Sequence, residues 1–282
     1  MAGPLVRSAL PYDVLIGGRF SPENISALWT DRPRPTTPRV EELIEREWTF
    51  RLAQAARSGA RLFDGRLGRY VGHEVVGRRL TLTLGPTRYR DFVGTNLYHP
   101  ELAERFGWEY LSNPVGTTAT LITADDYLVF GRRSGKVAYH AGFLHTFGGS
   151  LEAADLRPGG RVDVRGSLDR ELQEELGLRA SETATVECSG MIRDHEILQP
   201  ELLFEVHLLL TRRQLLDRFA AVGDDEHLAA EACPVHPRQI VPFLRQAAPV
   251  APVAVGAMML FGAQRWGRGW LTEASESLCP RP

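Results

Sequence analysis

Three carboxylates stand close together in the segment Arg170–Leu178, whose sequence is R-E-L-Q-E-E-L-G-L. Glu171, Glu174 and Glu175 have offsets of zero, three and four residues, so on an α-helix, at about 100° per residue, they share one face. Like charges at this spacing destabilise a bare helix. A hard cation such as Mg²⁺, which prefers several oxygen ligands, would remove the repulsion. The segment therefore indicates a magnesium site, with an ordinary solvated helix surface as the alternative.

The helix that carries these glutamates is predicted from its apolar positions. Leu168, Leu172 and Leu176 recur at every fourth residue and form a stripe about a quarter turn from the acidic face. Gly177 suits the left-handed residue that ends a helix, and Leu178 suits the apolar contact that follows it. The helix can therefore bury one side and present its carboxylates on another.

The same segment meets all nine positions of the second half of the Nudix box, R-E-U-x-E-E-x-G-U with U apolar, so the chain resembles the Nudix hydrolases. Upstream, Phe147-Gly148-Gly149 supplies the glycines, and Asp155 stands where the box has its first Glu. Residues 156 to 169 then make fourteen intervening positions where the box has seven. Because residues 156–161 are rich in turn formers, we expect a surface loop inserted before the helix.

Segments outside the box indicate a branch of this superfamily. Four segments resemble, in order and spacing, the Nudix hydrolases that split UDP-glucose and UDP-galactose. They are Leu62-Phe63-Asp64, residues 89–96, residues 123–130 and Arg132-Arg133-Ser134. Members of that branch also carry an insertion before the box helix. The resemblance implies Mg²⁺-dependent hydrolysis of the pyrophosphate bond of UDP-sugars to UMP and sugar 1-phosphate, with Mn²⁺ as the alternative metal.

Two rivals to this function stay open. The box reports a diphosphate linked to another group, so ADP-ribose, NADH and coenzyme A are alternative substrates. A Nudix-fold sensor, which binds a nucleotide sugar without hydrolysing it, is the alternative outside the enzymes. The intact set of box glutamates argues against a sensor.

The resemblance implies roles for the acidic residues. Glu171, Glu174 and Glu175 would bind the metal, and Glu171 and Glu174 are also the candidate catalytic residues, since a carboxylate there can orient the attacking water. A further metal ligand is expected from the loop 224–227, where Glu226 is the candidate and a solvated loop tip is the alternative. The turn 194–196 is a second place for such an acid.

Candidate substrate-binding residues lie upstream of the box and at its glycines. They are Arg90, Asp91, Thr95, Asn96, Arg132, Gly148 and Gly149. The mixture of an arginine fork, small residues and aromatic rings over residues 89–96 suits a phosphate and a uracil or sugar. The structural alternative is a turn capped by Thr95 and Asn96 beside a local Arg90–Asp91 ion pair. Arg132 and Arg133 follow a predicted strand and could meet phosphates at a sheet edge.

The remaining pattern predicts strands around the box helix with flanking helices. This order matches the α/β fold that the resemblance implies, a Nudix-type α/β/α sandwich with a mixed sheet, here with a smaller N-terminal α+β domain added. The boundary is expected at Asn113-Pro114, between a substrate-contributing domain, 1–112, and a Nudix hydrolase domain, 113–282. Helices are expected at 40–58, 212–219 and 239–246, strands at 75–76, 80–84, 185–193 and 202–211, a strand pair or one bent strand within 117–130, a turn at 64–70 and an apolar element at 251–261.

Composition restricts the partners. The chain has 282 residues, a net charge of −2 and no basic block, so it lacks the electrostatic footprint of a nucleic-acid-binding protein. Cys188, Cys233 and Cys279 show neither zinc spacing nor a disulfide pattern, which indicates a reducing compartment. The most apolar stretch, 250–262, is too short to span a bilayer. We therefore expect a cytoplasmic protein whose partner is a small-molecule UDP-sugar, without nucleic acid or membrane.

Overall fold

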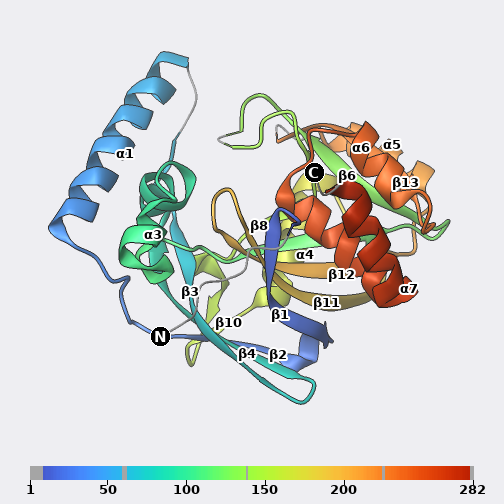
Figure 1. Ribbon diagram of the computed structural model, residues 1–282, viewed down its shortest axis with the longest axis horizontal. Helices are drawn as coiled ribbons and strands as arrows, with labels where there is room; N and C mark the ends of the chain where they lie inside the picture. The colour runs from blue at the N-terminus through green and yellow to red at the C-terminus, as the bar shows by residue number, and fades with distance from the viewer. Residues whose placement is uncertain (1–8, 59–61, 138, 224–225, 280–282) are drawn as a thin grey trace.

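A computed structural model describes residues 9–58, 62–137, 139–223 and 226–279 (Figure 1). The strands are β1 Tyr12–Phe20, β2 Ile25–Trp29, β3 Arg66–Val76, β4 Arg79–Arg88, β5 Gly116–Ile122, β6 Tyr127–Arg133, β7 Leu144–His145, β8 Phe147–Ser150, β9 Leu156–Arg157, β10 Arg161–Val162, β11 Thr183–Asp194, β12 Pro200–Leu208 and β13 His227–Pro234. The helices are α1 Pro38–Ser58, α2 Tyr89–Phe92, α3 Leu102–Phe106, α4 Val164–Leu176, α5 Arg212–Val222, α6 Ile240–Gln246 and α7 Pro252–Leu278.

The larger sheet has the order β1-β11-β12-β5-β6-β13, with β8 added to β5 and β7 added to β6. Strands β12 and β5 are parallel and the other pairs are antiparallel. One face packs on α4 and α5 through leucines such as Leu168 and Leu215, and the other packs on α6 and α7 through residues such as Leu244 and Met258. The prediction of an α/β/α sandwich with a mixed sheet is confirmed.

The smaller sheet has the order β3-β4-β2-β10-β9, with β2 and β4 parallel. It takes β9 and β10 from the segment inserted before the box helix, which forms a hairpin around Gly159 and Gly160, both at positive φ. This segment is therefore an added sheet edge, and the expected surface loop is only its turn. The larger sheet in turn takes β1 from the N-terminal part of the chain. Each sheet thus contains strands from both sides of residue 113.

The two sheets meet along β3, which positions the N-terminal half next to the box. The Gly68 N–H donates to the Leu151 carbonyl at 2.7 Å, and Leu67 and Arg69 form isolated bridges with Glu152 and Pro114. Residues 151 and 152 follow the box glycines after a single residue, Ser150. Any rearrangement of β3 would therefore displace the backbone next to the box glycines.

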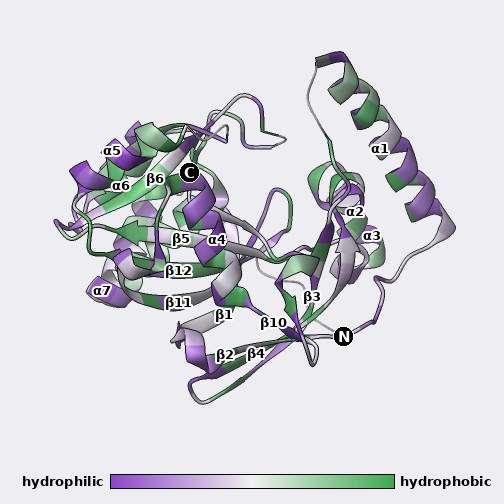
Figure 2. Ribbon diagram, turned by 180° about the vertical axis from the view of Figure 1, so that it is seen from behind, coloured by the Kyte–Doolittle hydropathy of each residue, from purple (hydrophilic) through white to green (hydrophobic). Residues whose placement is uncertain are grey.

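Helix α1 lies at the outer edge of the N-terminal half (Figures 1 and 2). Its hydrophilic and hydrophobic residues alternate along the ribbon in Figure 2. Val40 and Ile44 are fully buried and pack with Leu102 and Leu111. Its helical period thus matches the prediction for 40–58, and the opposite side of the helix faces solvent.

Most predicted elements are present. Strands β3 and β4 contain the stretches predicted at 75–76 and 80–84, and the strand pair β5–β6 occupies the stretch predicted for it. Strands β11 and β12 and helices α5 and α6 lie where they are predicted. The turn at 64–70 is wrong, because β3 begins at Arg66; Gly68 and Gly72 interrupt the alternation that marks a strand. The apolar element at 251–261 is the first part of the longer α7. Over the described ranges, no helix is both long and apolar enough to span a bilayer.

Candidate active site

Helix α4 carries the three glutamates, and local contacts fix both of its ends. The Asp163 carboxylate accepts an N–H of the first turn at 2.8 Å and caps the helix. Gly177 ends it in the left-handed region, at φ 62°, as predicted. The stripe of Leu168, Leu172 and Leu176 is buried in the core of the larger sheet. The helix is therefore rigidly placed relative to β8 and β5.

Glu175 is buried between α4 and the box glycines. Its Oε2 accepts the Gly148 N–H at 2.8 Å, its Oε1 lies 3.7 Å from Nδ1 of His227, and only 7% of its side chain is exposed. Gly148 has φ 141°, and a Cβ there would lie 2.1 Å from the Thr117 carbonyl oxygen. Glu175 thus ties α4 to strand β8, at a backbone position that only glycine can adopt.

Replacing Gly148 with Ala should destabilise the protein by roughly 2–4 kcal/mol, because the new Cβ would collide with backbone at a φ that L-residues rarely adopt. Denaturant unfolding measures this. Gly72→Ala is the matched control, since an added Cβ there meets nothing within 4 Å, and it should change stability by less than about 1 kcal/mol. An unfolding midpoint for Gly148→Ala equal to that of the wild type would contradict the requirement for glycine at this position of β8.

Glu171 lies over the second box glycine and beside Arg170. A Cβ on Gly149 would lie 2.6 Å from the carboxyl carbon of Glu171, so glycine leaves the room that this carboxylate uses. Nη1 of Arg170 donates to Oε1 of Glu171 at 2.7 Å, and 15% of the Glu171 side chain is exposed. Burial raises the pKa of Glu171 to about 7; Arg170 opposes the shift, while the charges of Glu174 and Glu152 add to it.

The raised pKa of Glu171 predicts how the stability of the metal-free protein varies with pH. The folded-state pKa, about 7, lies above the ordinary value of 4.5, so ionisation of Glu171 disfavours the folded state. This cost is absent below about pH 4.5 and grows as the pH rises to about 7. With chelator present, the melting temperature of the wild type should therefore fall relative to Glu171→Gln across this window. Parallel melting curves for the two proteins would contradict the raised pKa.

Glu174 points toward solvent, and Arg170 links it to a buried acid. The Glu174 side chain is 61% exposed, with its carboxylate 3.8 Å from Nη1 of Arg170. Nη2 of Arg170 lies 3.6 Å from Oδ1 of Asp155, and Asp155 also accepts the Glu152 N–H at 2.8 Å. Arg170 thus bridges Asp155 and the carboxylates of α4. In the structure Asp155 is the buried partner of that arginine.

The donor set on α4 suits a hard divalent cation in its chemistry. Among the residues that the structure describes, no three acidic, imidazole or thiol groups converge closely enough to hold an ion as they stand. Glu171, Glu174 and Glu175 nevertheless offer carboxylate oxygens, which are the donors that Mg²⁺ prefers. The negative charge of Glu174 helps to raise the pKa of Glu171, and a cation would relieve this repulsion. The residues therefore fit such an ion by type and by their shared helix.

The loop before β13 brings a histidine, rather than an acid, against α4. The Glu226 side chain is 56% exposed, with Oε2 4.0 Å from Nη1 of Arg133. The His227 ring is buried, faces Glu175 and lies 4.9 Å from the ring of Phe147. Residues 224 and 225, from the same predicted acidic run, lie outside the described residues. The sequence pattern predicts no strand at 227–234, and a β-bulge between His227 and Ala229 interrupts the alternation that could have indicated the buried side of His227.

The turn 194–196 satisfies its own polar groups. Oδ1 of Asp194 accepts the Ile197 N–H at 2.9 Å, and Oε2 of Glu196 lies 3.1 Å from Nε2 of His140. His195 lies 3.0 Å from Asp13 of β1. These contacts join the end of β11 to its neighbours, as in the alternative of a polar turn.

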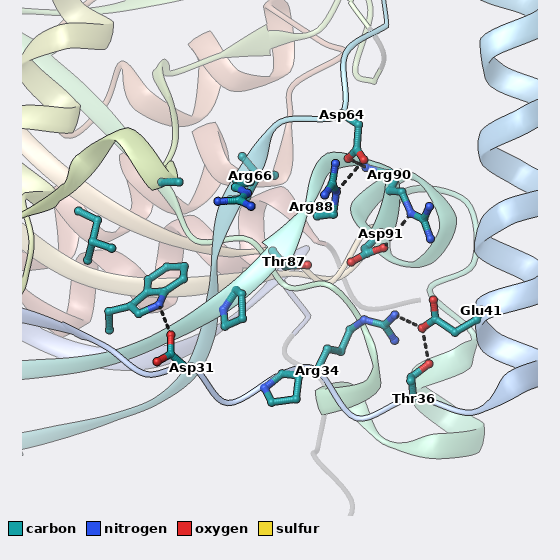
Figure 3. Close-up of a pocket in the computed structure, with 16 residues that line it drawn as sticks. Asp31, Arg34, Thr36, Glu41, Asp64, Arg66, Thr87, Arg88, Arg90 and Asp91 are labelled. Atoms are coloured by element: carbon teal, nitrogen blue, oxygen red, sulfur yellow. Dashed lines mark hydrogen bonds and ion pairs between the residues drawn. The ribbon is translucent and has the colours of Figure 1, made fainter. Parts of the chain in front are cut away.

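A cavity of about 900 Å³ lies in the N-terminal half, among the smaller sheet, α1 and α2 (Figure 3). Its walls include four arginines and four carboxylates, together with Ala153 and Leu156 from the segment before the box helix. Arg90 and Asp91 both line it, with Nε of Arg90 3.5 Å from Oδ1 of Asp91 and Nη1 3.3 Å from Glu45. Burial raises the pKa of Asp91, and the positive charge of nearby arginines opposes the shift.

This cavity adjoins the surroundings of α4. Arg66, Leu67 and Ala153 line both the cavity and a neighbouring depression that also includes Tyr89 and Glu152. The charge of Glu152 in turn acts on the pKa of Glu171 on α4. Arg66 stands apart from the ion pairs in Figure 3, whereas Arg88 is paired with Asp64.

Thr95 and Asn96 are buried and engaged within the protein. Oγ1 of Thr95 donates to the Asp91 carbonyl at 2.6 Å and accepts the Ser112 N–H at 2.9 Å. Nδ2 of Asn96 donates to Oδ1 of Asn113 and to the Ile197 carbonyl, both at 2.9 Å. These bonds fix the segment that carries Arg90 and Asp91 to the end of the larger sheet.

The two arginines at the end of β6 point to opposite faces of the sheet. Nε of Arg132 donates to Glu231 at 2.8 Å, and Nη1 donates to the carbonyls of Gly142 and Pro249, both at 3.1 Å. Arg133 is directly opposite His227 in the β6–β13 register, so these two side chains share the face that α4 covers. Sequence reasoning selected Arg132, although alternation along the strand separates it from Arg133.

Comparisons with known proteins agree with the family that the box motif indicates. No family model matches the chain. The human protein named uridine diphosphate glucose pyrophosphatase NUDT22 is 30% identical over 274 residues, which cover 87% of this chain and 89% of the human one. The bovine protein of that name is 44% identical over 91 residues, covering 29% of this chain and 31% of its own.

Two further matches are more distant. Nudix hydrolase 9 of Arabidopsis thaliana is 30% identical over 155 residues, 47% of each chain. A solved structure, the MutT protein of Methanosarcina mazei, covers 54% of this chain and 94% of its own at 14% identity, with a TM-score of 0.38 that is too low to add to the argument. The long match to the human protein decides the assignment: the chain belongs to the Nudix hydrolases, in the family of the uridine diphosphate glucose pyrophosphatase NUDT22.

Proposed function

We propose that this Nudix hydrolase cleaves the pyrophosphate bond of UDP-sugars, UDP-glucose and UDP-galactose among them, to give UMP and a sugar 1-phosphate. The observation that carries the proposal is the placement of Glu171 and Glu175 directly against the box glycines, with Glu174 beside them on α4. The name of the human relative supports uridine as the base and a sugar as the second group.

We assign Mg²⁺, or Mn²⁺ in its place, to Glu171, Glu174 and Glu175, with Glu226 as a further ligand. When bound, the metal supplies charge neutralisation for the diphosphate and lowers the cost of ionising a water. Oε1 of Glu171 is engaged by Arg170, which leaves Oε2 to accept a proton from the attacking water.

The substrate would lie between α4 and the N-terminal half. Gly148 and Gly149 would border the diphosphate beside Glu171 and Glu175, the two carboxylates that lie against them. Arg90 and Asp91 would contact the nucleotide or sugar from the cavity of Figure 3. Thr95, Asn96 and Arg132 would act by holding these segments in place, because their side chains are engaged with the protein. Residues 1–112 would thus contribute to substrate binding and 113–282 to hydrolysis.

Replacing Arg90 with Ala should raise KM for UDP-glucose by about tenfold, because a charged hydrogen-bond donor is lost, with kcat changed by less than about twofold. Steady-state kinetics with Mg²⁺ measure both constants. The matched control is Arg78→Ala in the β3–β4 turn, which is exposed and should leave KM unchanged. An unchanged KM for Arg90→Ala would show that the cavity lined by Arg90 does not bind the substrate.

A substrate panel tests the proposed class. The purified protein is assayed with UDP-glucose, UDP-galactose, ADP-ribose, NADH and coenzyme A at equal concentration. We expect kcat/KM for the two UDP-sugars to exceed the others by about 10²-fold or more, since a site built to pair with one base rejects another strongly. A preference for ADP-ribose, NADH or coenzyme A would keep the assignment as a hydrolase and change its substrate.

A further inference from the structure

Arg133 is a buried arginine that the protein leaves incompletely paired. Only 8% of its side chain is exposed, and over the described ranges its Nε has no hydrogen-bond partner. Its side-chain contacts there are the Glu226 carboxylate, 4.0 Å from Nη1, and the ring of Tyr139, whose centroid is 4.9 Å from the guanidinium carbon. A guanidinium has five N–H donors, and burying them unpaired is costly. Donors of this guanidinium therefore remain available to a partner outside the chain.

The position of Arg133 in the sheet directs it to the box. Strands β5 and β6 pair only at Leu121–Val129 and Ile122–Leu128, after which β8 continues the pairing on β5 and β7 continues it on β6. Arg133 lies at the end of β6 where the two strands have separated. It shares its face with His227, which reaches to 3.7 Å from Glu175 on α4. Arg133 therefore lies on the side of the sheet that carries the box glutamates.

The N-terminal half approaches the same place through α2. The positive charge of Arg133 and the negative charge of Glu226 both act on the pKa of Tyr89, which burial raises to about 12. Tyr139, which stacks on Arg133, also packs edge-to-face on Phe92 with ring centroids 6.0 Å apart. Tyr89 in turn borders the depression that contains Glu152. Arg133 is thus linked to α2 through Tyr139, and to α4 through the face of the sheet that it shares with His227.

We infer that Arg133 binds the diphosphate of the substrate, with its guanidinium fork on two phosphate oxygens; this inference rests on the proposed function. A diphosphate brought to α4 meets the negative charges of Glu171, Glu174 and Glu175, and Arg133 supplies positive charge on the same face of the sheet. The fork geometry matches phosphate oxygens, and the charge persists at any physiological pH. Neighbouring Arg132 cannot do this from its present contacts with Glu231 and two carbonyls.

Binding of UDP and of uridine to the metal-free protein separates this role from a structural one. Isothermal titration with chelator present compares wild type, Arg133→Ala and Arg133→Lys. We expect Arg133→Ala to weaken UDP binding by about tenfold or more and uridine binding by less than about twofold, and Arg133→Lys to restore part of the UDP affinity. Arg213→Ala on α5 is the control, since its side chain is 90% exposed and pairs with Asp217 of the same helix, and it should leave UDP affinity unchanged.

Equal UDP affinity in Arg133→Ala and wild type would overturn the inference and assign Arg133 a structural role. A wild type that does not bind UDP would also overturn the inference. A melting temperature for each variant identifies any that fails to fold, and Arg133→Lys then carries the test. Hydrolysis is scored separately: if UDP binding depends on Arg133 but UDP-glucose is not cleaved, the proposed function fails and the inference stands.

Discussion

Replacing Glu174 with Gln should lower the turnover of UDP-glucose by about 10²–10⁴-fold and leave the melting temperature within about 2 °C of the wild type. The Glu174 side chain is 61% exposed, and its carboxylate lies 3.8 Å from Arg170 on the same helix. Little packing or ion pairing is therefore lost in the variant. An amide has the shape of the carboxylate without its charge, and it is a poorer ligand for Mg²⁺. Steady-state kinetics and a thermal melt of the same preparation measure the two quantities.

The control for that variant is Glu273→Gln on α7, another exposed glutamate, which should change neither turnover nor melting temperature. If turnover is indifferent to Glu174→Gln, the glutamates of α4 do not form the centre of the reaction. A drop in turnover accompanied by a large fall in melting temperature would instead assign Glu174 a structural role.

Replacing Glu175 with Ala should remove activity and stability together. The Gly148 N–H would lose its acceptor at 2.8 Å, and the buried His227 would lose the carboxylate beside it. We expect a loss of roughly 2–4 kcal/mol in unfolding free energy, from the unsatisfied donor and the cavity, and turnover lower by at least about 10²-fold. Chemical unfolding and kinetics measure these effects.

Glu175→Gln separates the two roles of that residue. The amide oxygen can still accept the Gly148 N–H, so most of the stability should return, whereas the lost charge should keep turnover low. Full turnover in Glu175→Gln would show that the charge of this residue is not used. A stable Glu175→Ala would contradict the description of Glu175 as the junction between α4 and β8.

The box helix was predictable because its signals are local. Gly177 ends α4 in the left-handed region and the leucine stripe is buried, both within one element. Side-chain roles that depend on a partner element were not predictable in this way. Arg132 and Arg133 are adjacent and chemically identical, and only the pairing of β6 with β13 shows which of them faces α4. Thr95 and Asn96 likewise find their hydrogen-bond partners far along the chain, at residues 112, 113 and 197.

The exchange of strands between the two sheets could not be predicted from local pattern. Strand β1 pairs with β11, which lies far along the chain, and β10 pairs with β2 across a similar separation. Periodicity identifies a strand and its buried face but carries no information about its neighbour in the sheet. The insertion before α4 contains enough glycine and proline to predict a turn, and its two flanking strands are only two residues each. Strands that short have no measurable alternation.

Product analysis of UDP-glucose treated with the purified protein tests the central claim most directly. Phosphorus-31 NMR follows the reaction with Mg²⁺, with excess chelator, and with the Glu174→Gln variant. Hydrolysis centred on α4 predicts equal amounts of UMP and glucose 1-phosphate with Mg²⁺, and little of either product in the other two samples. UDP-glucose that remains intact with Mg²⁺, or products that form equally with chelator or with Glu174→Gln, would contradict it.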